Sequence, residues 1–166
     1  MKAIVQKDTP EGQVLRISSH SIDVDTLPND EVNQELKDMQ EALATQHDGV
    51  ALAGPQIGIS KRVFVVAPII FKDNPEEMQL VFINPTIIKS SKDKKKMEEG
   101  CLSVRGKYGK VRRSTRVTIF AYDENGDEFE LSAGGLLAQI FQHEIDHLDG
   151  ILFVDKAVDI IEITKK

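Results

Sequence analysis

The sequence predicts a single α+β domain in which antiparallel or mixed β-sheets pack around a helix near the C-terminus. Short runs of β-forming residues follow one another between residues 62 and 131, without a helical pattern between them. Apolar residues at helical spacing flank this β-rich part, at residues 29–49 and 134–148. A length of 166 residues suits one domain with a substantial core, so we expect the domain to span residues 1–166.

The first helix is predicted after an irregular N-terminal stretch. Asn29 and Asp30 can cap it. The apolar residues that recur at helical spacing behind this cap are Val32, Leu36, Met39 and Leu43. We expect the helix to end near residues 47–49, where Gly49 permits the left-handed turn that closes many helices.

The β-rich part contains short segments bounded by proline or turn residues, which is typical of strands. These segments are residues 62–67, 80–84, 86–89, 116–122 and 128–131. Residues 123–127, Asp-Glu-Asn-Gly-Asp, predict a hairpin between the last two. The lysine run at residues 94–96 is expected in a solvated polar loop. A β-branched, partly alternating tail at residues 157–164 predicts a short C-terminal strand.

The second helix is predicted from about Gly134 to Leu148, closed by Gly150. Two stripes run along it, offset by roughly a third of a turn. The first stripe consists of Leu136, Ile140, His143 and His147, and the second of Leu137, Phe141 and Leu148. We expect one stripe to anchor the helix in the core. The other either continues into a hydrophobic pocket or is also core.

Composition and charge narrow the class of protein. A net charge of -6 argues against a broad nucleic-acid-binding surface, although a local basic patch is compatible with it. The apolar stretches are too short to span a bilayer, and the N-terminus lacks the apolar core of a signal peptide. The single cysteine excludes an intramolecular disulfide and fits a reducing cytosol. We therefore expect a cytoplasmic protein with no nucleic-acid and no membrane partner.

Residues 143–147 read His-Glu-Ile-Asp-His, which is the pattern His-Glu-x-x-His. Residues four apart stack on one face of a helix, so His143 and His147 can bind one metal ion. Glu144 then lies close enough to accept the proton of a water at that ion. This arrangement is typical of hydrolytic metal centres.

A catalytic metal site needs a third protein ligand and one open position. Two protease patterns are incomplete, because Phe153 holds the place of a third histidine and Glu162, the only later glutamate, lies in a predicted strand. The other candidates in the chain are His20, His47 and Cys101. Cys101 fits best, since a thiolate with two imidazoles suits a tetrahedral ion that has one exchangeable position.

Three segments of the chain resemble the three motifs of the peptide deformylase family. Residues 49–58, Gly-Val-Ala-Leu-Ala-Gly-Pro-Gln-Ile-Gly, resemble the first motif. Residues 99–103, Glu-Gly-Cys-Leu-Ser, resemble the second, and residues 142–150, Gln-His-Glu-Ile-Asp-His-Leu-Asp-Gly, resemble the third. The resemblance implies a hydrolase that removes the formyl group from the N-terminal formylmethionine of newly made polypeptides and releases formate.

The resemblance also implies roles for the motif residues. Cys101, His143 and His147 hold one divalent ion, which the family implies is Fe²⁺ in the cell, with Zn²⁺, Ni²⁺ or Co²⁺ as substitutes; ligand type alone favours zinc. Glu144 acts first as a base and then as an acid. The side-chain amide of Gln56 and the backbone N–H of Leu102 donate hydrogen bonds to the formyl oxygen.

Further residues are implied around the substrate. The residues that resemble the family's methionine pocket are Val50, Met97, Leu136 and Ile140. The substrate backbone is expected to add as a strand beside Gly49, Val50 and Ala51. Asp146 and Arg113 resemble a charged pair that braces the motif helix, with a plain surface ion pair as the alternative for Asp146, and Glu99 is expected to support the metal ligands.

Four departures from the family pattern modify these expectations. Ala51 stands where glycine is usual, and its methyl group is expected to crowd the substrate strand. Gly54 stands where alanine is usual, and is expected to loosen the loop that carries Gln56. Residues 104–108 lack the common proline, so substrate preference at this rim is expected to differ. The C-terminal helix with which some bacterial members contact the ribosome has no counterpart in the sequence, which leaves ribosome proximity by that route in doubt.

Two rival functions are weighed beside the deformylase. A metallo-endopeptidase would hydrolyse unformylated peptides, but its ligand sets are incomplete. A non-enzymatic relative would bind formylated N-termini or a structural metal, and it would have no need for Glu144. We expect N-formylmethionyl peptides as the partners and a monomer as the working unit.

Overall fold

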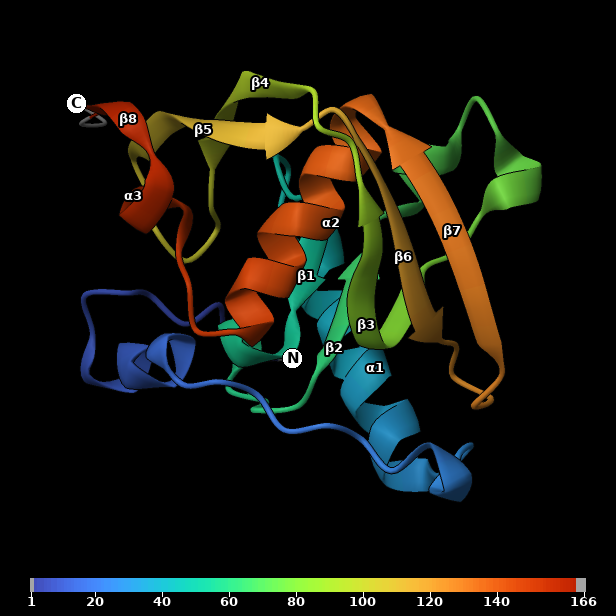
Figure 1. Ribbon diagram of the computed structural model, residues 1–166. Helices are drawn as coiled ribbons and strands as arrows, with labels where there is room; N and C mark the ends of the chain where they lie inside the picture. Colours follow the sequence, from blue (N-terminus) through green and yellow to red (C-terminus); the bar gives the residue numbers. More distant parts are fainter. Residues whose placement is uncertain (1, 164–166) are drawn as a thin grey trace.

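The computed structural model describes residues 2–163 (Figure 1). Its helices are α1 (Asp30–Ala44), α2 (Gly135–Leu148) and the short α3 (Phe153–Lys156), and Gly54–Ile57 form a turn of 3₁₀-helix. Its first four strands are β1 (Ala51–Ala53), β2 (Val63–Val66), β3 (Val81–Ser90) and β4 (Lys94–Gly100). The others are β5 (Lys107–Ser114), β6 (Arg116–Tyr122), β7 (Glu128–Gly134) and β8 (Val158–Glu162).

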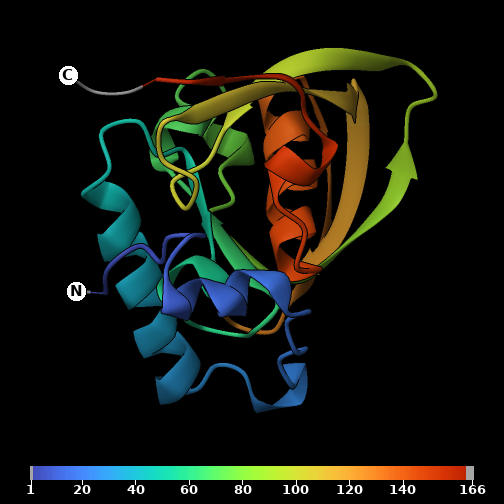
Figure 2. The same ribbon diagram turned by 90° about the vertical axis from the view of Figure 1, so that its left-hand side faces the viewer.

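The strands form two antiparallel sheets on either side of α2. The larger sheet has the order β1-β2-β3-β6-β7, and the smaller has the order β4-β5-β8. Figures 1 and 2 show α2 enclosed between them, in contact with strands of both. The predicted α+β class, with sheets around the motif helix and a short C-terminal strand, is confirmed.

Two hydrophobic clusters occupy the two faces of the larger sheet. On one face, α2 inserts Phe141 against the stacked rings of Phe64 and Phe82, whose centroids lie 4.5 Å apart. On the other face, α1 packs its apolar residues against β1, β2 and β3. The stripe with Phe141 and Leu148 is therefore the one that anchors α2 in the core, as expected for one of the two.

The N-terminal helix is confirmed at its start and differs at its end. The Asn29 side chain accepts a hydrogen bond from the Val32 N–H at 2.9 Å, which caps α1. The helix ends at Ala44, and the next residues turn through bonds from the Gln46 N–H to the Leu43 carbonyl and from the Gly49 N–H to the Gln46 carbonyl. Gly49 does not have a positive φ, so the left-handed closure expected there is wrong.

The prediction of a polar loop for the lysine run is also wrong. Residues 94–96 begin β4, which pairs with β5 along its whole length, from Lys94 opposite Ser114 to Gly100 opposite Tyr108. Lysine has a low β propensity, but cross-strand pairing overrides it here. The segments predicted at residues 80–84 and 86–89 join into the single strand β3, whose register shifts between Ile83 and Thr86.

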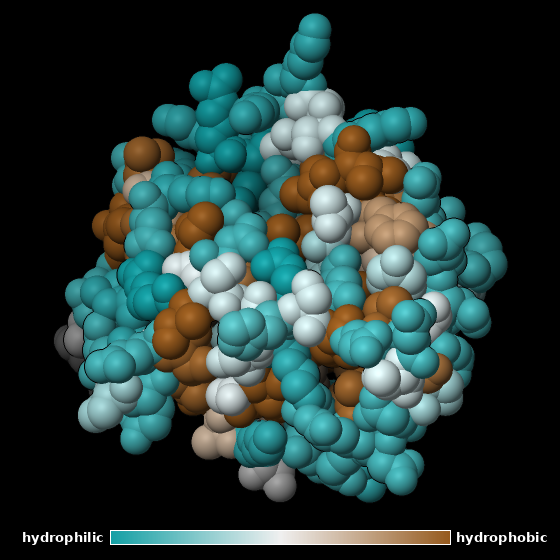
Figure 3. All heavy atoms as spheres, turned by 60° about the horizontal axis from the view of Figure 1, so that its bottom comes forward, coloured by the Kyte–Doolittle hydropathy of each residue, from teal (hydrophilic) through white to brown (hydrophobic). Residues whose placement is uncertain are grey.

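Most of the predicted C-terminal strand is present as β8; Thr164 lies outside the described residues. Hydrophilic residues cover most of the face shown in Figure 3, and the hydrophobic residues on it form separate patches. Within residues 2–163, no helix is both long and apolar enough to cross a membrane.

Candidate metal centre

Helix α2 and the segment after β4 bring three potential metal ligands together. His143 and His147 lie one turn apart on α2, and Cys101 follows the last residue of β4. One ligand atom of each residue lies within 4.8 Å of the other two. Cys101 Sγ is 3.2 Å from His147 Nε2. His20 and His47 do not belong to this group, so of the three candidate third ligands only Cys101 is correctly placed.

The neighbour of His143 leaves one nitrogen of its ring free for an ion. The Glu99 carboxylate lies 2.8 Å from His143 Nδ1, which leaves Nε2 of that ring for a metal. One sulfur and two imidazole nitrogens within 4.8 Å of one another suit a tetrahedral divalent ion with one open position. The residues present thus fit the divalent ion that the resemblance implies.

The surroundings of Cys101 favour its thiolate. Burial acts to raise the pKa of the thiol, but the positive charge of His147 and hydrogen bonds from His143 and His147 outweigh it, and the pKa falls to about 5. The thiolate is the form that binds metals, so this residue is ionised at neutral pH before any ion arrives.

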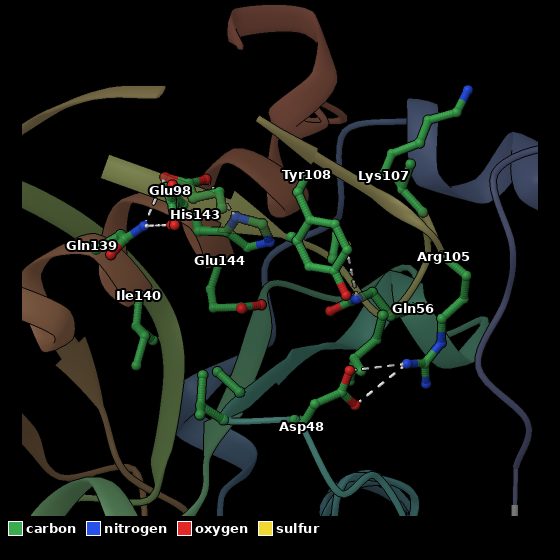
Figure 4. Close-up of a pocket in the computed structure, with 18 of the residues that line it drawn as sticks. Asp48, Gln56, Glu98, Arg105, Lys107, Tyr108, Gln139, Ile140, His143 and Glu144 are labelled. Carbon is green, nitrogen blue, oxygen red and sulfur yellow. Dashed lines mark hydrogen bonds and ion pairs between the residues drawn. The ribbon is translucent and has the colours of Figure 1, made fainter. Parts of the chain in front are cut away.

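Glu144 is buried beside the ligands with an uncompensated oxygen. Its side chain is 4% exposed, and Oε2 has no hydrogen-bond partner within residues 2–163. Burial raises the pKa of this carboxyl above its usual range. An unpartnered buried carboxylate oxygen is costly, which is typical of a group that receives its partner from a ligand or substrate. Figure 4 shows the Glu144 carboxylate and the Gln56 amide facing the same space.

Gln56 is held so that its amide N–H groups point toward the ligands. Its Oε1 accepts a hydrogen bond from the Ala53 N–H at 2.9 Å. Its Nε2 is then directed at Ser103 Oγ, 3.2 Å away, and at Cys101 Sγ, 3.5 Å away. Ser103 is a positioning residue that the sequence analysis missed, although it ends the second motif.

Gly54 holds the turn before Gln56 tightly. A Cβ at this position would lie 2.7 Å from the Ile59 carbonyl oxygen and 3.0 Å from that of Lys61. The expectation that Gly54 loosens the loop is therefore wrong, because the backbone approaches too closely for any side chain.

Two of the three potential ligands, Cys101 and His143, line a cavity of about 290 Å³, and the third, His147, is buried behind it. Five of the six predicted substrate-binding residues also line it: Gly49, Val50, Ala51, Leu136 and Ile140. Leu102 also lines it. Met97 does not; it lies on β4 opposite Val111. Ala51 also belongs to the core cluster of the larger sheet and is 6% exposed; that its methyl group crowds the substrate strand stays a prediction.

Other residues at the mouth of the cavity were missed. Asp48 and Arg105 form an ion pair across one end, and Lys107 and Tyr108 lie beside them (Figure 4). Gln139 donates a 2.8 Å hydrogen bond to the Glu98 carbonyl. Gln139 directly precedes Ile140 in α2, but nothing in the sequence shows that β4 passes within reach of it.

A buried charge network supports His143. Arg113 donates to both oxygens of Glu99, at 2.7 and 2.8 Å, and to Asp146 at 2.6 Å. Lys156 reaches Asp146 at 2.9 Å. The expected contact between Arg113 and Asp146 is present, and Asp146 is not in a plain surface pair. The network joins β4, β5 and α2 directly behind the His143 ring.

Comparisons with known proteins agree with this geometry. Residues 1–162 match the family described as Polypeptide deformylase. The chain is 38% identical over 160 residues to peptide deformylase 2 of Clostridium acetobutylicum, covering 96% of this chain and 99% of the relative. It is 51% identical over 118 residues to the peptide deformylase of Halothermothrix orenii, covering 70% of this chain and 72% of the relative.

A solved structure shows the same fold at similar identity. The crystal structure of a peptide deformylase from Legionella pneumophila superimposes with a TM-score of 0.83 at 36% identity, over 96% of this chain and 87% of that one. Neither a metallo-endopeptidase nor a non-enzymatic binder is favoured by these comparisons. The chain belongs to the polypeptide deformylase family, the metal-dependent hydrolases that remove the formyl group from the N-terminus of newly made polypeptides.

Proposed function

We propose that the cavity beside α2 is the deformylation site of this chain, with Cys101, His143 and His147 as the ligands of one divalent ion. The observation that carries the proposal is the buried Glu144 carboxylate, unpartnered at Oε2 and lining the same cavity as Cys101 and His143. A structural metal site would have no use for such a group. When bound, the ion supplies a Lewis acid that lowers the pKa of a water and polarises the formyl oxygen.

Glu144 moves the protons of the reaction. It accepts a proton from the attacking water as the water oxygen bonds to the formyl carbon. It then gives that proton to the α-amine as the carbon–nitrogen bond breaks, so that formate and a free amine are released. Its raised pKa suits both steps, because a carboxyl that is too acidic would not return the proton.

Gln56 and Leu102 stabilise the charge that develops on the formyl oxygen. The Gln56 Nε2 is fixed by the bond between its Oε1 and the Ala53 N–H, so it cannot rotate its oxygen into the site. The backbone N–H of Leu102, next to Cys101, is the second donor. Donors fixed in advance cost no reorganisation during the reaction.

The methionine side chain is expected against Val50, Leu136 and Ile140, which form the apolar part of the cavity. The substrate backbone runs beside β1. This strand pairs only with β2 and ends the sheet, and residues 49–51 line the cavity. Backbone recognition at a strand edge tolerates varied side chains, as an enzyme of many nascent chains requires.

We further propose Fe²⁺ as the ion in the cell, with Zn²⁺, Ni²⁺ or Co²⁺ as substitutes, and a monomer working in the cytoplasm near the ribosome. A thiolate ligand would make an Fe²⁺ form sensitive to oxidation. Purification under anaerobic conditions, followed by metal analysis of the active sample, tests the identity of the ion.

The decisive experiment compares two substitutions in the same cavity. Glu144→Ala should keep its metal and lose about 10²- to 10⁴-fold in kcat/KM for a formyl-Met peptide. Glu98→Ala, at the exposed rim, should change kcat/KM by less than about threefold. Formate release and metal content are measured on the same samples. Wild-type rates in fully metallated Glu144→Ala would rule out the assignment, and cleavage of unformylated peptides would point to an endopeptidase.

A further inference from the structure

Positive charge is concentrated in one part of this acidic chain. Residues 89–116 contain eleven of the 21 lysines and arginines but only three of the 27 aspartates and glutamates. In the structure this segment forms the end of β3, all of β4 and β5, and the start of β6. These strands meet at the top of Figure 1, above α2.

The outer face of the smaller sheet carries four exposed cations, Lys94, Lys96, Lys110 and Arg112, which we name the basic face. One exposed acid, Glu98, shares this side of β4 and lies opposite Lys110, so the face keeps an excess of positive charge. Lys96 lies directly opposite Arg112 in the register of β4 and β5. Like charges at such positions destabilise a sheet. Within residues 2–163, Lys94, Lys96 and Arg112 form no ion pair, and Lys110 reaches only Asp159, at 3.6 Å. An uncompensated like-charge pair is typical of a surface whose partner is another molecule.

Prevention of edge-to-edge pairing between sheets explains only some of the cations on the basic face. Lysines on an edge strand prevent edge-to-edge pairing, and β4 is an edge of its sheet. However, Lys110 and Arg112 lie on β5, the central strand. Their charges add nothing to the protection of the β4 edge.

A depression beside the turn from β3 to β4 extends the basic face. It has a volume of about 240 Å³, and the side chains that carry its polar groups are Lys89, Ser91, Arg116, Thr118 and Ser132. Phosphate oxygens accept hydrogen bonds from lysine and arginine side chains and from hydroxyl groups, and both kinds of donor are present in the depression. The depression and the basic face thus form one band of cations around the corner between the two sheets.

We propose that this band docks the protein on the phosphate backbone of RNA. A polyanion matches several cations spaced along two strands, whereas a single small anion would engage one of them. The choice of RNA rather than DNA rests on the proposed function, since newly made polypeptides emerge from an RNA-rich particle. Lys94 lies six residues from Gly100, or about 20 Å along β4, so RNA bound at that end of the band lies away from the cavity mouth. Lys110, opposite the cavity-lining residue Glu98, marks the end of the band nearest the cavity.

The experiment uses a fluorescein-labelled RNA duplex of about 20 base pairs, with fluorescence anisotropy at about 50 mM salt and above. Lys96→Glu/Arg112→Glu should lose about tenfold or more in affinity, and the slope of log affinity against log salt should fall by about 2. The folding cost is small, because two opposed carboxylates repel as the two cations do. The control Lys37→Glu/Lys72→Glu changes the net charge equally, at two exposed lysines outside the band, and should lose less than about threefold.

Several outcomes would overturn the proposal. Equal loss in the two double variants would show that only net charge matters. Self-association of Lys96→Glu/Arg112→Glu in sedimentation velocity, with unchanged RNA affinity, would assign the cations to edge protection. Binding of the wild type to phosphatidylserine vesicles but not to RNA would assign them to a membrane surface. Anisotropy does not depend on formate release, so failure of the proposed function would leave this result interpretable by itself.

Discussion

Substitution of Arg113 by methionine should destabilise the protein strongly. The side chain is 4% exposed and bonds to Glu99, which is 6% exposed, and to Asp146. Asp146 keeps Lys156 as a partner, so the main penalty falls on Glu99, which is left with His143 and a long contact to Gln139. Removing one partner of a buried ion pair costs about 3–5 kcal/mol. For a chain of this length that corresponds to a decrease in Tm of about 10 °C.

Arg112→Met provides the matched control, since it makes the same change one residue earlier on the exposed side of β5. It should alter the free energy of unfolding by less than about 0.5 kcal/mol. Urea denaturation of the two variants and the wild type measures the difference. Adding Glu99→Gln to Arg113→Met should recover part of the loss, because the unpaired charge is then removed.

The effect should also depend on pH in a defined direction. Burial acts to raise the pKa of Glu99, but hydrogen bonds from Arg113 and His143 outweigh it and lower the pKa from 4.5 to about 2. A carboxyl with a depressed pKa stabilises the fold above its unfolded value and loses that stabilisation as the pH falls toward the folded one. The gap between wild type and Arg113→Met should therefore be widest above pH 4.5 and narrow toward pH 2. A loss no larger than that of Arg112→Met, or a gap independent of pH, would refute the reasoning.

Two further predictions concern the active site. In metal-free protein Cys101 should react with iodoacetamide at pH 6, because its pKa of about 5 leaves mostly thiolate there, and metal loading should suppress the reaction; a labelling rate that rises only near pH 9 would contradict this. Gly54→Ala should lower stability by roughly 1–3 kcal/mol in thermal melts, although alanine is the family's usual residue, because the new Cβ would meet the Ile59 carbonyl oxygen at 2.7 Å; an unchanged Tm would show that this loop yields easily.

The sequence correctly predicts those features of the fold and of the site that depend on residues close together in the chain. Two histidines four residues apart need only a helix to share a face, and the Asn29 cap and the hairpin at residues 123–127 are likewise set by neighbouring residues. The pairing of β4 with β5 is different. It decides that Glu99 and Arg113 face α2 while Lys96 and Arg112 face outward, and no short-range signal in a run of charged residues reveals that register.

The same limit explains the errors at the cavity. Met97 was expected in the pocket from the resemblance; it lies on the same side of β4 as Glu99, opposite Val111, but does not line the cavity. Tyr108 and Arg105 reach the mouth only because the segment between β4 and β5 folds back beside residue 48. Such contacts depend on the packing of the two sheets, which periodicity in one segment cannot report.

The ligand set also has a mechanical consequence. Cys101 belongs to the end of the smaller sheet, whereas both histidines belong to the helix that packs in the core of the larger one. An ion at this point fastens the two sheets together with coordinate bonds, so its binding free energy adds to the free energy of unfolding. An ion at a hundred times its dissociation constant contributes about 2.7 kcal/mol. Without the ion, the protein would lose both its catalytic activity and this link between the two sheets. We expect the end of β4, which carries Glu99 and part of the cavity wall, to unfold locally first.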